Sequence, residues 1–264
     1  MLQRLERKVV ISNSSSSKNW FVCPQANPAA ETRLFLFPYA GGGLAVLHDW
    51  SVSLPNHLEA WIAHYPGRGS RHYEPPMKQI STFVEGLSQA IQPLLIKPFA
   101  FFGHSLGGLV AFELTRHLHR NNLTQPQILF VSACSAPHLP DLHAPIHVLP
   151  NSDFVKSLQQ LNGIPSELLN QEEVMQLYLP ILRADFEAME SYVYTTDNSP
   201  LRCPIVAFGG LDDPRVGRER IEGWGLHTNS GFRSQYFSGD HFFINTARDL
   251  VLASILAEVT SSHV

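Results

Sequence analysis

The stretch that most constrains the fold of this chain is Gly103-His104-Ser105-Leu106-Gly107, which lies between an apolar run and a helical pattern. This is the G-x-S-x-G pattern, with a buried strand before it and a helix after it. A nucleophile at a sharp strand-to-helix turn sits in strained backbone, so the residues two positions away must lack bulky side chains. Gly103 and Gly107 meet that requirement, and Gly108 lets the helix begin close to the sheet. The pattern predicts a nucleophilic Ser105; the alternative is an incidental serine in a glycine-rich turn.

The length and composition are those of one globular domain. A chain of 264 residues with 44% hydrophobic and 16% charged residues can bury one core and has no signature of disorder. Residues 1–18 contain four consecutive serines, and we expect them to form a flexible leader. Residues 19–264 are then a single domain, and we find no repeats.

Charge and motif content exclude several classes of function. The net charge of -4 and the lack of any Lys/Arg run argue against a nucleic-acid partner. No apolar stretch has the length of a membrane span, and residues 1–10 lack the apolar core of a signal peptide, so we expect a cytoplasmic protein. The scattered cysteines Cys23, Cys134 and Cys203 read as buried free thiols. No H-E-x-x-H is present, and we expect no metal site.

The order of apolar and helical patterns predicts an α/β protein. Strands are expected at 20–23 (an edge strand), 33–38, 58–65, 98–102, 128–133, 203–208 and 232–237, and helices at 44–54, 80–95, 110–119 and 242–260. Strands that alternate with helices imply a mostly parallel sheet covered on both faces. Ligands bind such sheets at the carboxyl ends of the strands.

The stretch from about 138 to 200 differs in character and predicts an inserted helical lid. Prolines at 140, 145, 150, 165 and 180 divide it into short helices such as 153–161 and 172–192, with no strand pattern. We expect this lid to gate access to the site and to shape it, with Phe186 and Met189 as substrate contacts. The alternative is that its apolar residues only pack the lid on the sheet; these residues include Leu158, Leu161, Leu177, Phe186 and Met189.

A serine hydroxyl needs a base within hydrogen-bond reach, and that base needs a carboxylate to orient it. His241 follows the last expected strand, and the chain order of serine, acid and histidine is that of the α/β-hydrolase fold. Asp213 and Asp212 both follow the penultimate strand, and since neighbours point differently only one reaches His241; we favour Asp213. Weaker alternatives for the acid are Asp240 and Asp185.

Two backbone N–H groups are expected to bind the oxyanion that forms on attack. Leu106 N–H at the helix start is the first, and Ala40 N–H, in the loop after the strand 33–38, is the second. The glycines 41–43 keep this approach open; they could also form a plain flexible turn or a phosphate cradle. Neither G-x-G-x-x-G nor Gly-Lys-Ser/Thr is present, which argues against a nucleotide site. His104 lies inside the elbow and is expected to pack beneath it.

Six motifs in order carry a resemblance to a known family. They are Phe37-Pro38-Tyr39-Ala40-Gly41-Gly42-Gly43, Tyr65-Pro66-Gly67-Arg68-Gly69-x-Arg71, Gly103-His104-Ser105-Leu106-Gly107-Gly108, Leu182-Arg183-Ala184-Asp185-Phe186, Gly210-Leu211-Asp212-Asp213 and Gly239-Asp240-His241-Phe242-Phe243. From residue 20 onward the chain resembles the type II thioesterases of non-ribosomal peptide and polyketide synthases, and the related medium-chain thioesterase of fatty-acid synthesis. One departure is Asp240, where the family often has a second glycine.

The resemblance implies a triad of Ser105, Asp213 and His241, with Ala40 and Leu106 as oxyanion donors. It implies hydrolysis of acyl groups from the phosphopantetheine arm of a carrier protein, clearing stalled or misprimed chains, with no cofactor of the enzyme's own. The alternatives are a thioesterase that releases medium-chain fatty acids and a non-catalytic module that binds an acyl-carrier arm. An intact triad argues against the latter.

Recognition of a carrier protein is expected to depend on a local basic patch. Carriers of this chemistry are usually acidic, yet this chain is itself net negative. Arg68 and Arg71 are the candidates, because their loop follows a strand and lies on the active-site side of the sheet. Arg68 could instead fix its own loop through backbone carbonyls, and Arg71 is the one expected at the surface. We expect the enzyme to act as a monomer.

Overall fold

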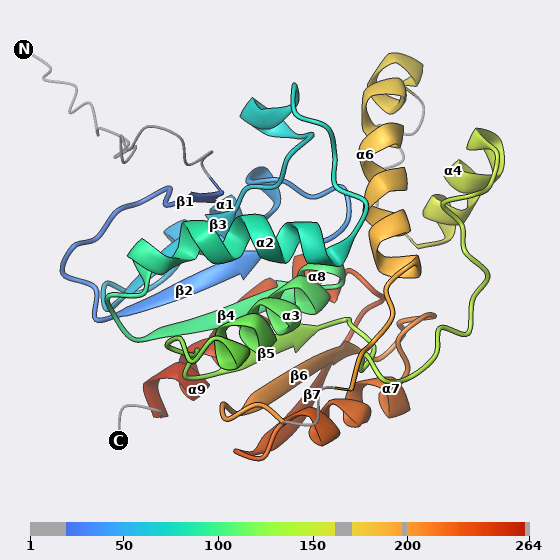
Figure 1. The fold of residues 1–264 in the computed structure, drawn as a ribbon. Helices are drawn as coiled ribbons and strands as arrows, with labels where there is room; N and C mark the ends of the chain where they lie inside the picture. The colour runs from blue at the N-terminus through green and yellow to red at the C-terminus, as the bar shows by residue number, and fades with distance from the viewer. Residues whose placement is uncertain (1–19, 162–170, 197–199, 262–264) are drawn as a thin grey trace, which may run out of the picture.

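The structure is a computed structural model that describes residues 20–161, 171–196 and 200–261. The leader expected over residues 1–18 lies outside the described residues. Figure 1 shows a central sheet with helices on both faces and a pair of helices, α4 and α6, at one end of it.

The sheet has seven strands in the order β1-β3-β2-β4-β5-β6-β7. Their bounds are Phe21–Val22 (β1), Thr32–Phe37 (β2), Leu58–Ala63 (β3), Phe99–His104 (β4), Leu129–Ser132 (β5), Ile205–Gly210 (β6) and Phe232–Phe237 (β7). All neighbouring pairs are parallel except β1 with β3, so β1 is the antiparallel edge strand. The predicted α/β-hydrolase sheet is confirmed, and β4, which leads into Ser105, is its central strand.

The described helices cover the sheet and its carboxyl edge. Their bounds are Ala45–Val52 (α1), Ile80–Ile91 (α2), Leu106–Arg120 (α3), Asn151–Gln160 (α4), Glu172–Glu190 (α6), Arg218–Glu222 (α7), Phe243–Thr246 (α8) and Arg248–Ser261 (α9), with short 3-10 turns at 69–71, 92–94 and 223–227. Helices α2 and α3 lie on one face of the sheet, and α1, α8 and α9 lie on the other (Figure 1).

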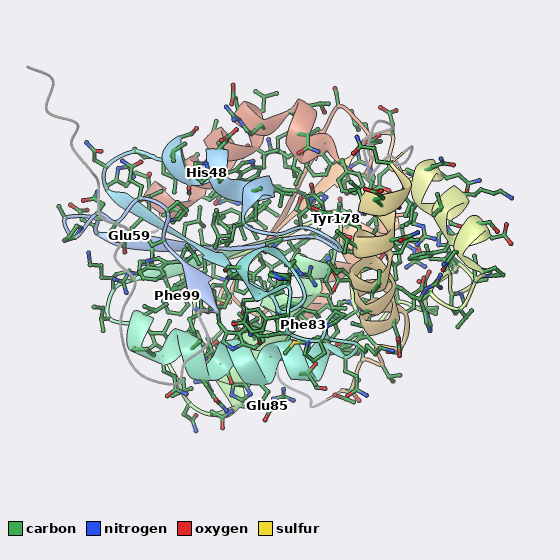
Figure 2. All side chains as sticks on the ribbon, turned by 90° about the horizontal axis from the view of Figure 1, so that it is seen from above. His48, Glu59, Phe83, Glu85, Phe99 and Tyr178 are labelled. Carbon is green, nitrogen blue, oxygen red and sulfur yellow. The ribbon has the colours of Figure 1, made fainter. Side chains whose placement is uncertain are left out.

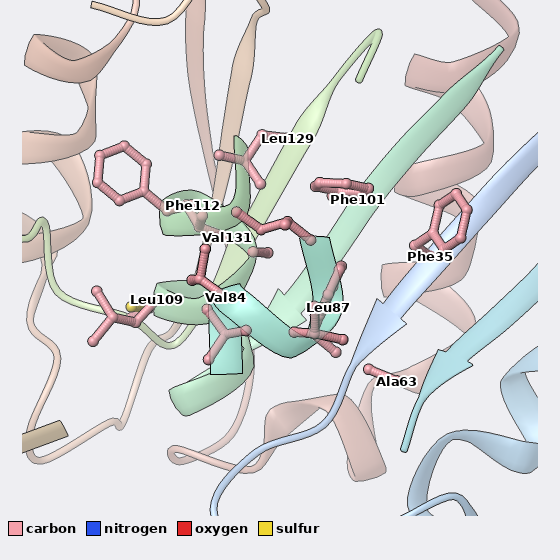
Figure 3. Packing of buried hydrophobic residues seen from close by; sticks show 14 of the residues in the cluster. Phe35, Ala63, Val84, Leu87, Phe101, Leu109, Phe112, Leu129 and Val131 are labelled. Carbon is pink, nitrogen blue, oxygen red and sulfur yellow. The ribbon is translucent and has the colours of Figure 1, made fainter. Parts of the chain in front are cut away.

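Both faces of the sheet are apolar because parallel strands are buried on both sides. In β2, Phe35 and Phe37 join the cluster under α2 and α3, while Leu34 and Leu36 join the cluster under α1 and α9. Figure 3 shows the first of these clusters, in which Phe35 and the side chains of α2 and α3 pack over the strands. The continuous apolar run 33–37 is therefore a strand that is buried on both faces of the sheet.

Between β5 and β6, the described residues form two helices, α4 and α6, joined to the sheet by irregular segments at 133–150 and 192–196. Helix α6 and helix α4 share an apolar cluster built on Phe154, Leu158, Leu182 and Phe186. In Figure 2 the α6 residue Tyr178 lies at the opposite end of the molecule from Glu59 and Phe99, which begin β3 and β4. The helices thus sit at the carboxyl ends of the strands.

Two local expectations were wrong. Leu177 points into solvent, 74% exposed, because it lies on the outer face of α6, so it neither packs the lid nor lines a site. The expected C-terminal helix is two helices, since Ala247 leaves the helical region at φ -108° and ψ 23°. Helix α3 begins at Leu106, as the expected donor at the helix start required, although its helical pattern shows only from residue 110 because glycines 107 and 108 hide the periodicity.

The three cysteines are free and buried, as predicted. Burial raises the pKa of each of the three thiols, Cys23, Cys134 and Cys203, to about 12, so they stay protonated and inert. Among the helices that the structure describes, none combines the length and apolar character of a membrane span.

Candidate active site

Ser105 occupies a strained turn between β4 and α3. Its backbone lies at φ 53° and ψ -117°, a region that non-glycine residues rarely adopt. Its N–H donates to the Ser132 carbonyl of the neighbouring strand at 2.8 Å, which holds the turn against the sheet. Leu106 is the first residue of α3, so its N–H is one of the groups that an α-helix leaves without an internal partner. The hydroxyl and a backbone donor are therefore presented together at the helix start.

The glycines around the serine are required by contact distances. A Cβ on Gly103 would lie 2.1 Å from the Gly107 carbonyl oxygen, and a Cβ on Gly107 would lie 2.0 Å from the carbonyl oxygen of Phe37. Both distances are far inside van der Waals contact with backbone atoms that cannot move aside. The first turn of α3 therefore lies against the end of β2, where the loop with Ala40 begins.

Asp213 and His241 meet above this edge. His241 Nδ1 lies 2.8 Å from Asp213 Oδ2, with side chains 10% and 0% exposed. The other carboxylate oxygen, Oδ1, accepts the N–H groups of Arg215 (2.8 Å) and Val216 (3.1 Å). Burial alone raises the pKa of Asp213, but the His241 ring and these two N–H groups outweigh it, and the pKa is lowered overall. The carboxylate is ionised and aimed at one ring nitrogen.

The other acids do not reach this ring. Asp212 is exposed, and its N–H is bonded to the Gly239 carbonyl. Asp240 Oδ1 accepts the Phe242 N–H at 2.8 Å and so braces the loop that carries the histidine. Asp185 is buried in a different contact, with Arg68. The geometry therefore supports Asp213, which sequence reasoning favoured.

His104 lies beneath the elbow, as the sequence analysis expected. Its Nδ1 is 2.9 Å from the Ser132 hydroxyl, and the ring is fully buried. Burial first, and then the nearby His241 ring, lower the pKa of His104 well below its ordinary value. The ring is therefore neutral, and it packs 5.5 Å from His241 between ring centroids.

Ser105 and His241 line one cavity of about 210 Å³ at the carboxyl edge. The lid contributes Leu161, Phe186 and Met189 to its wall, so the two predicted substrate contacts are part of the lining. Sequence reasoning missed the loop after β5, residues 133–137, and Arg215 in the loop after β6. The signal was present, because a loop that follows a parallel strand ends at this same edge.

The part of the chain that the structure describes contains no group of three or more His, Cys, Asp or Glu side chains suited to a metal ion.

Arg68 and Arg71 are both buried, 5% and 3% exposed. Arg71 pairs with Glu74 at 2.7 Å, donates to the His64 carbonyl and packs 4.3 Å over the ring of Trp20. The expectation that Arg71 lies at the surface was wrong. The charge pattern of the sequence does not show that Glu74, three residues away, pairs with the Arg71 guanidinium inside the protein.

Arg68 fixes its own loop through backbone carbonyls, which was the alternative to a role in carrier binding. It donates to the carbonyls of Pro66 (3.3 Å) and Gly42 (3.1 Å) and forms a two-bond ion pair with Asp185. Neither Arg68 nor Arg71 therefore presents a guanidinium to a docking protein.

The chain also matches a family model. Residues 32–259 match the thioesterase domain, a span that includes every residue of the site described above. The chain belongs to the thioesterase family. This thioesterase domain accounts for nearly all of the described fold.

This thioesterase is similar to several named proteins. The chain is 41% identical to the gramicidin S biosynthesis protein GrsT of Aneurinibacillus migulanus, over 87% of this chain and 90% of that protein. It is 40% identical to a Brevibacillus parabrevis protein named linear gramicidin dehydrogenase LgrE, over 93% of this chain and 94% of that protein. The structure of BorB, a type II thioesterase from the borrelidin biosynthetic cluster, superposes with a TM-score of 0.83 at 32% identity, covering 93% of this chain and 99% of that one.

The two neighbouring acids provide a first test of the site. Asp213→Asn keeps the shape of the side chain but leaves His241 in the wrong tautomer, so we expect kcat for thioester hydrolysis to fall about a thousandfold or more. Asp212→Asn should change kcat by less than about threefold, because this side chain is exposed and does not touch the ring. Steady-state kinetics of both variants measure this; equal losses, or the reverse order, would reassign the acid.

Proposed function

We propose that this thioesterase hydrolyses acyl and aminoacyl thioesters on the phosphopantetheine arm of carrier proteins, and so removes stalled or misprimed groups from a peptide or polyketide synthase. The observation that carries the proposal is the Asp213–His241 bond of 2.8 Å beside Ser105 in one cavity, within a thioesterase fold. The similarity to GrsT and BorB supports the synthase as the setting.

The chemistry follows from the positions of the side chains. His241 Nε2 takes the proton of Ser105 Oγ as the oxygen attacks the thioester carbonyl, while Asp213 on Nδ1 holds the ring and stabilises the imidazolium. The N–H groups of Leu106 and Ala40 bind the oxyanion. The carbon–sulfur bond breaks, and the pantetheine sulfur leaves with the proton from His241. Water, deprotonated by His241, then attacks the acyl-serine and releases the acid.

The cavity size favours short acyl groups over medium-length fatty chains. A cavity of about 210 Å³ lies below the range of roughly 300–1,000 Å³ typical of sites for drug-sized ligands. We therefore prefer an editing role over the release of fatty acids. A purely binding module has no need for the buried acid that orients His241.

Arg215 is our candidate for contact with the carrier's arm. It lines the cavity with Ser105 and His241, and none of the described carboxylates lies within ion-pairing distance of its guanidinium. The arm carries a phosphodiester, whose negative charge a guanidinium binds well. We propose that Arg215 meets this group, and that the enzyme is a cytoplasmic monomer.

The activity itself is tested with an acyl-pantetheine substrate and without any nicotinamide cofactor. We expect rapid release of one equivalent of thiol, followed by turnover, because an acyl-serine forms first. Ser105→Ala should abolish both phases. Since one relative bears the name of a dehydrogenase, NADPH is then added; its consumption in place of acid release would overturn the proposal.

Lid side chains should set the preference for acyl length. Phe186→Ala and Met189→Ala each enlarge the cavity, so we expect kcat/KM for a longer acyl chain to rise about tenfold relative to a short one. Leu177→Ala on the exposed face of α6 is the matched control and should change neither value. A uniform loss on all chain lengths would mean that the two residues only pack the lid.

Arg215→Ala should raise KM for acyl-phosphopantetheine several-fold, most strongly at low salt, where charges are least screened. KM for acyl-pantetheine, which has no phosphate, should stay unchanged. Arg218→Ala is the control, because Arg218 is stacked on Tyr236 outside the cavity. A similar loss with both substrates would mean that Arg215 supports the Asp213 loop and not the phosphate.

A further inference from the structure

The loop that carries Ala40 is a tight turn whose geometry depends on one peptide. Gly42 N–H donates to the Tyr39 carbonyl at 2.8 Å, and Gly41 has φ 75° while Ala40 does not have a positive φ. This combination defines a type II turn. Types I and II differ by reversal of the central peptide, so the direction of the Gly41 N–H decides which of the two forms.

A lid residue accepts that N–H. Asp185 on α6 places Oδ2 2.7 Å from Gly41 N and 2.7 Å from Arg68 Nη1, and Oδ1 2.8 Å from Arg68 Nη2. The same Arg68 Nη1 donates to the Gly42 carbonyl at 3.1 Å. Asp185 is fully buried. One ion pair therefore holds both a donor and an acceptor of the turn.

Packing brings the lid onto the same turn. A Cβ on Gly41 would lie 2.5 Å from Leu182 Cδ2, so α6 rests directly on the backbone there. Ala40 packs against the lid cluster that contains Leu182 and Phe186. The position of the turn is thus set by α6 as much as by the sheet.

We propose that Asp185 is a positioning residue for the oxyanion hole, and that Arg68 is its neutralising partner. By accepting the Gly41 N–H, Asp185 fixes the turn in its type II form and keeps the preceding N–H, that of Ala40, directed at the reacting carbonyl. This inference rests on the proposed role of Ala40 as an oxyanion donor.

The charge balance explains why the two residues act together. A buried carboxylate next to an oxyanion site would oppose the charge that develops there, because the interior screens it poorly. The two-bond pair with Arg68 cancels the negative charge while leaving Oδ2 able to accept the Gly41 N–H. Because Asp185 belongs to α6, the oxyanion hole is complete only when α6 is docked on the turn.

The experiment compares two carboxylates in buried arginine pairs. Asp185→Glu adds one methylene and moves the carboxylate off the Gly41 N–H while keeping the charge for Arg68. Glu74→Asp makes the matched change in the Arg71 pair, which also has two bonds of 2.7 Å and does not bond the turn. Measured quantities are kcat and KM for an acyl-pantetheine, the inhibition constant of an alkyl trifluoromethyl ketone that forms an oxyanion on Ser105, and the melting temperature.

We expect Asp185→Glu to lower kcat about 10- to 100-fold with KM nearly unchanged, since losing a whole oxyanion donor costs roughly 100- to 1,000-fold. The ketone should bind correspondingly more weakly, and the pH profile should keep its shape because the triad is intact. Glu74→Asp should lower the melting temperature but keep kcat within about twofold. Unchanged kcat in Asp185→Glu, or equal losses in both variants, overturns the proposal.

A second variant covers the case in which the longer side chain prevents folding. Asp185→Asn is isosteric and replaces one acceptor oxygen by an NH2 group, so we expect kcat and ketone affinity to fall together here too. Retention of both would overturn the proposal. The wild-type enzyme is assayed in parallel with Ser105→Ala: if the wild type does not hydrolyse the thioester, the proposed function fails, whereas an active wild type isolates the role of Asp185.

Discussion

The site depends on the contact between the first turn of α3 and the end of β2. Gly107 lies so close to the Phe37 carbonyl that no side chain fits between them, and this proximity brings the Leu106 N–H beside the loop of Ala40. The same approach forces Ser105 into its strained conformation, which the bond from its N–H to the Ser132 carbonyl helps to maintain. The strain at Ser105 is thus a consequence of placing its hydroxyl between the start of α3 and the end of β2.

A parallel sheet then gathers the remaining groups. Strands β2, β4, β6 and β7 each end at the same edge, and the loops that follow them carry Ala40, Ser105, Asp213 and His241. Strands β5 and β6 lie between β4 and β7, so the loop that carries His241 must extend back across the edge to reach Ser105. Asp213 orients the imidazole ring of His241 through a contact with its Nδ1. Asp240 stabilises the same loop by accepting the Phe242 N–H.

The lid contacts this edge of the sheet through apolar side chains and through one buried ion pair, and the two kinds of contact have different roles. Phe186 and Met189 of α6, with Leu161 just after α4, form part of the wall of the cavity. A buried ion pair, Arg68–Asp185, ties α6 to the turn of Ala40. Apolar packing tolerates exchange of similar side chains, whereas a carboxylate that must accept from three donors permits little displacement. The apolar residues of the lid that line the cavity can therefore be exchanged, whereas the Arg68–Asp185 pair fixes the position of α6 on the turn.

The sequence by itself determined the order of strands and helices, the elbow at Ser105, the lid between β5 and β6 and the histidine after the last strand. These features follow from local patterns, because apolar periodicity and glycine spacing report directly on burial and backbone geometry. It narrowed the acid to Asp213 or Asp212, but only the direction of each side chain in the folded loop separates them. It misplaced Arg71 and left Arg68 open, since a charge in a sequence does not reveal its partner. Arg68 and Asp185 are 117 positions apart, and only tertiary packing brings them together.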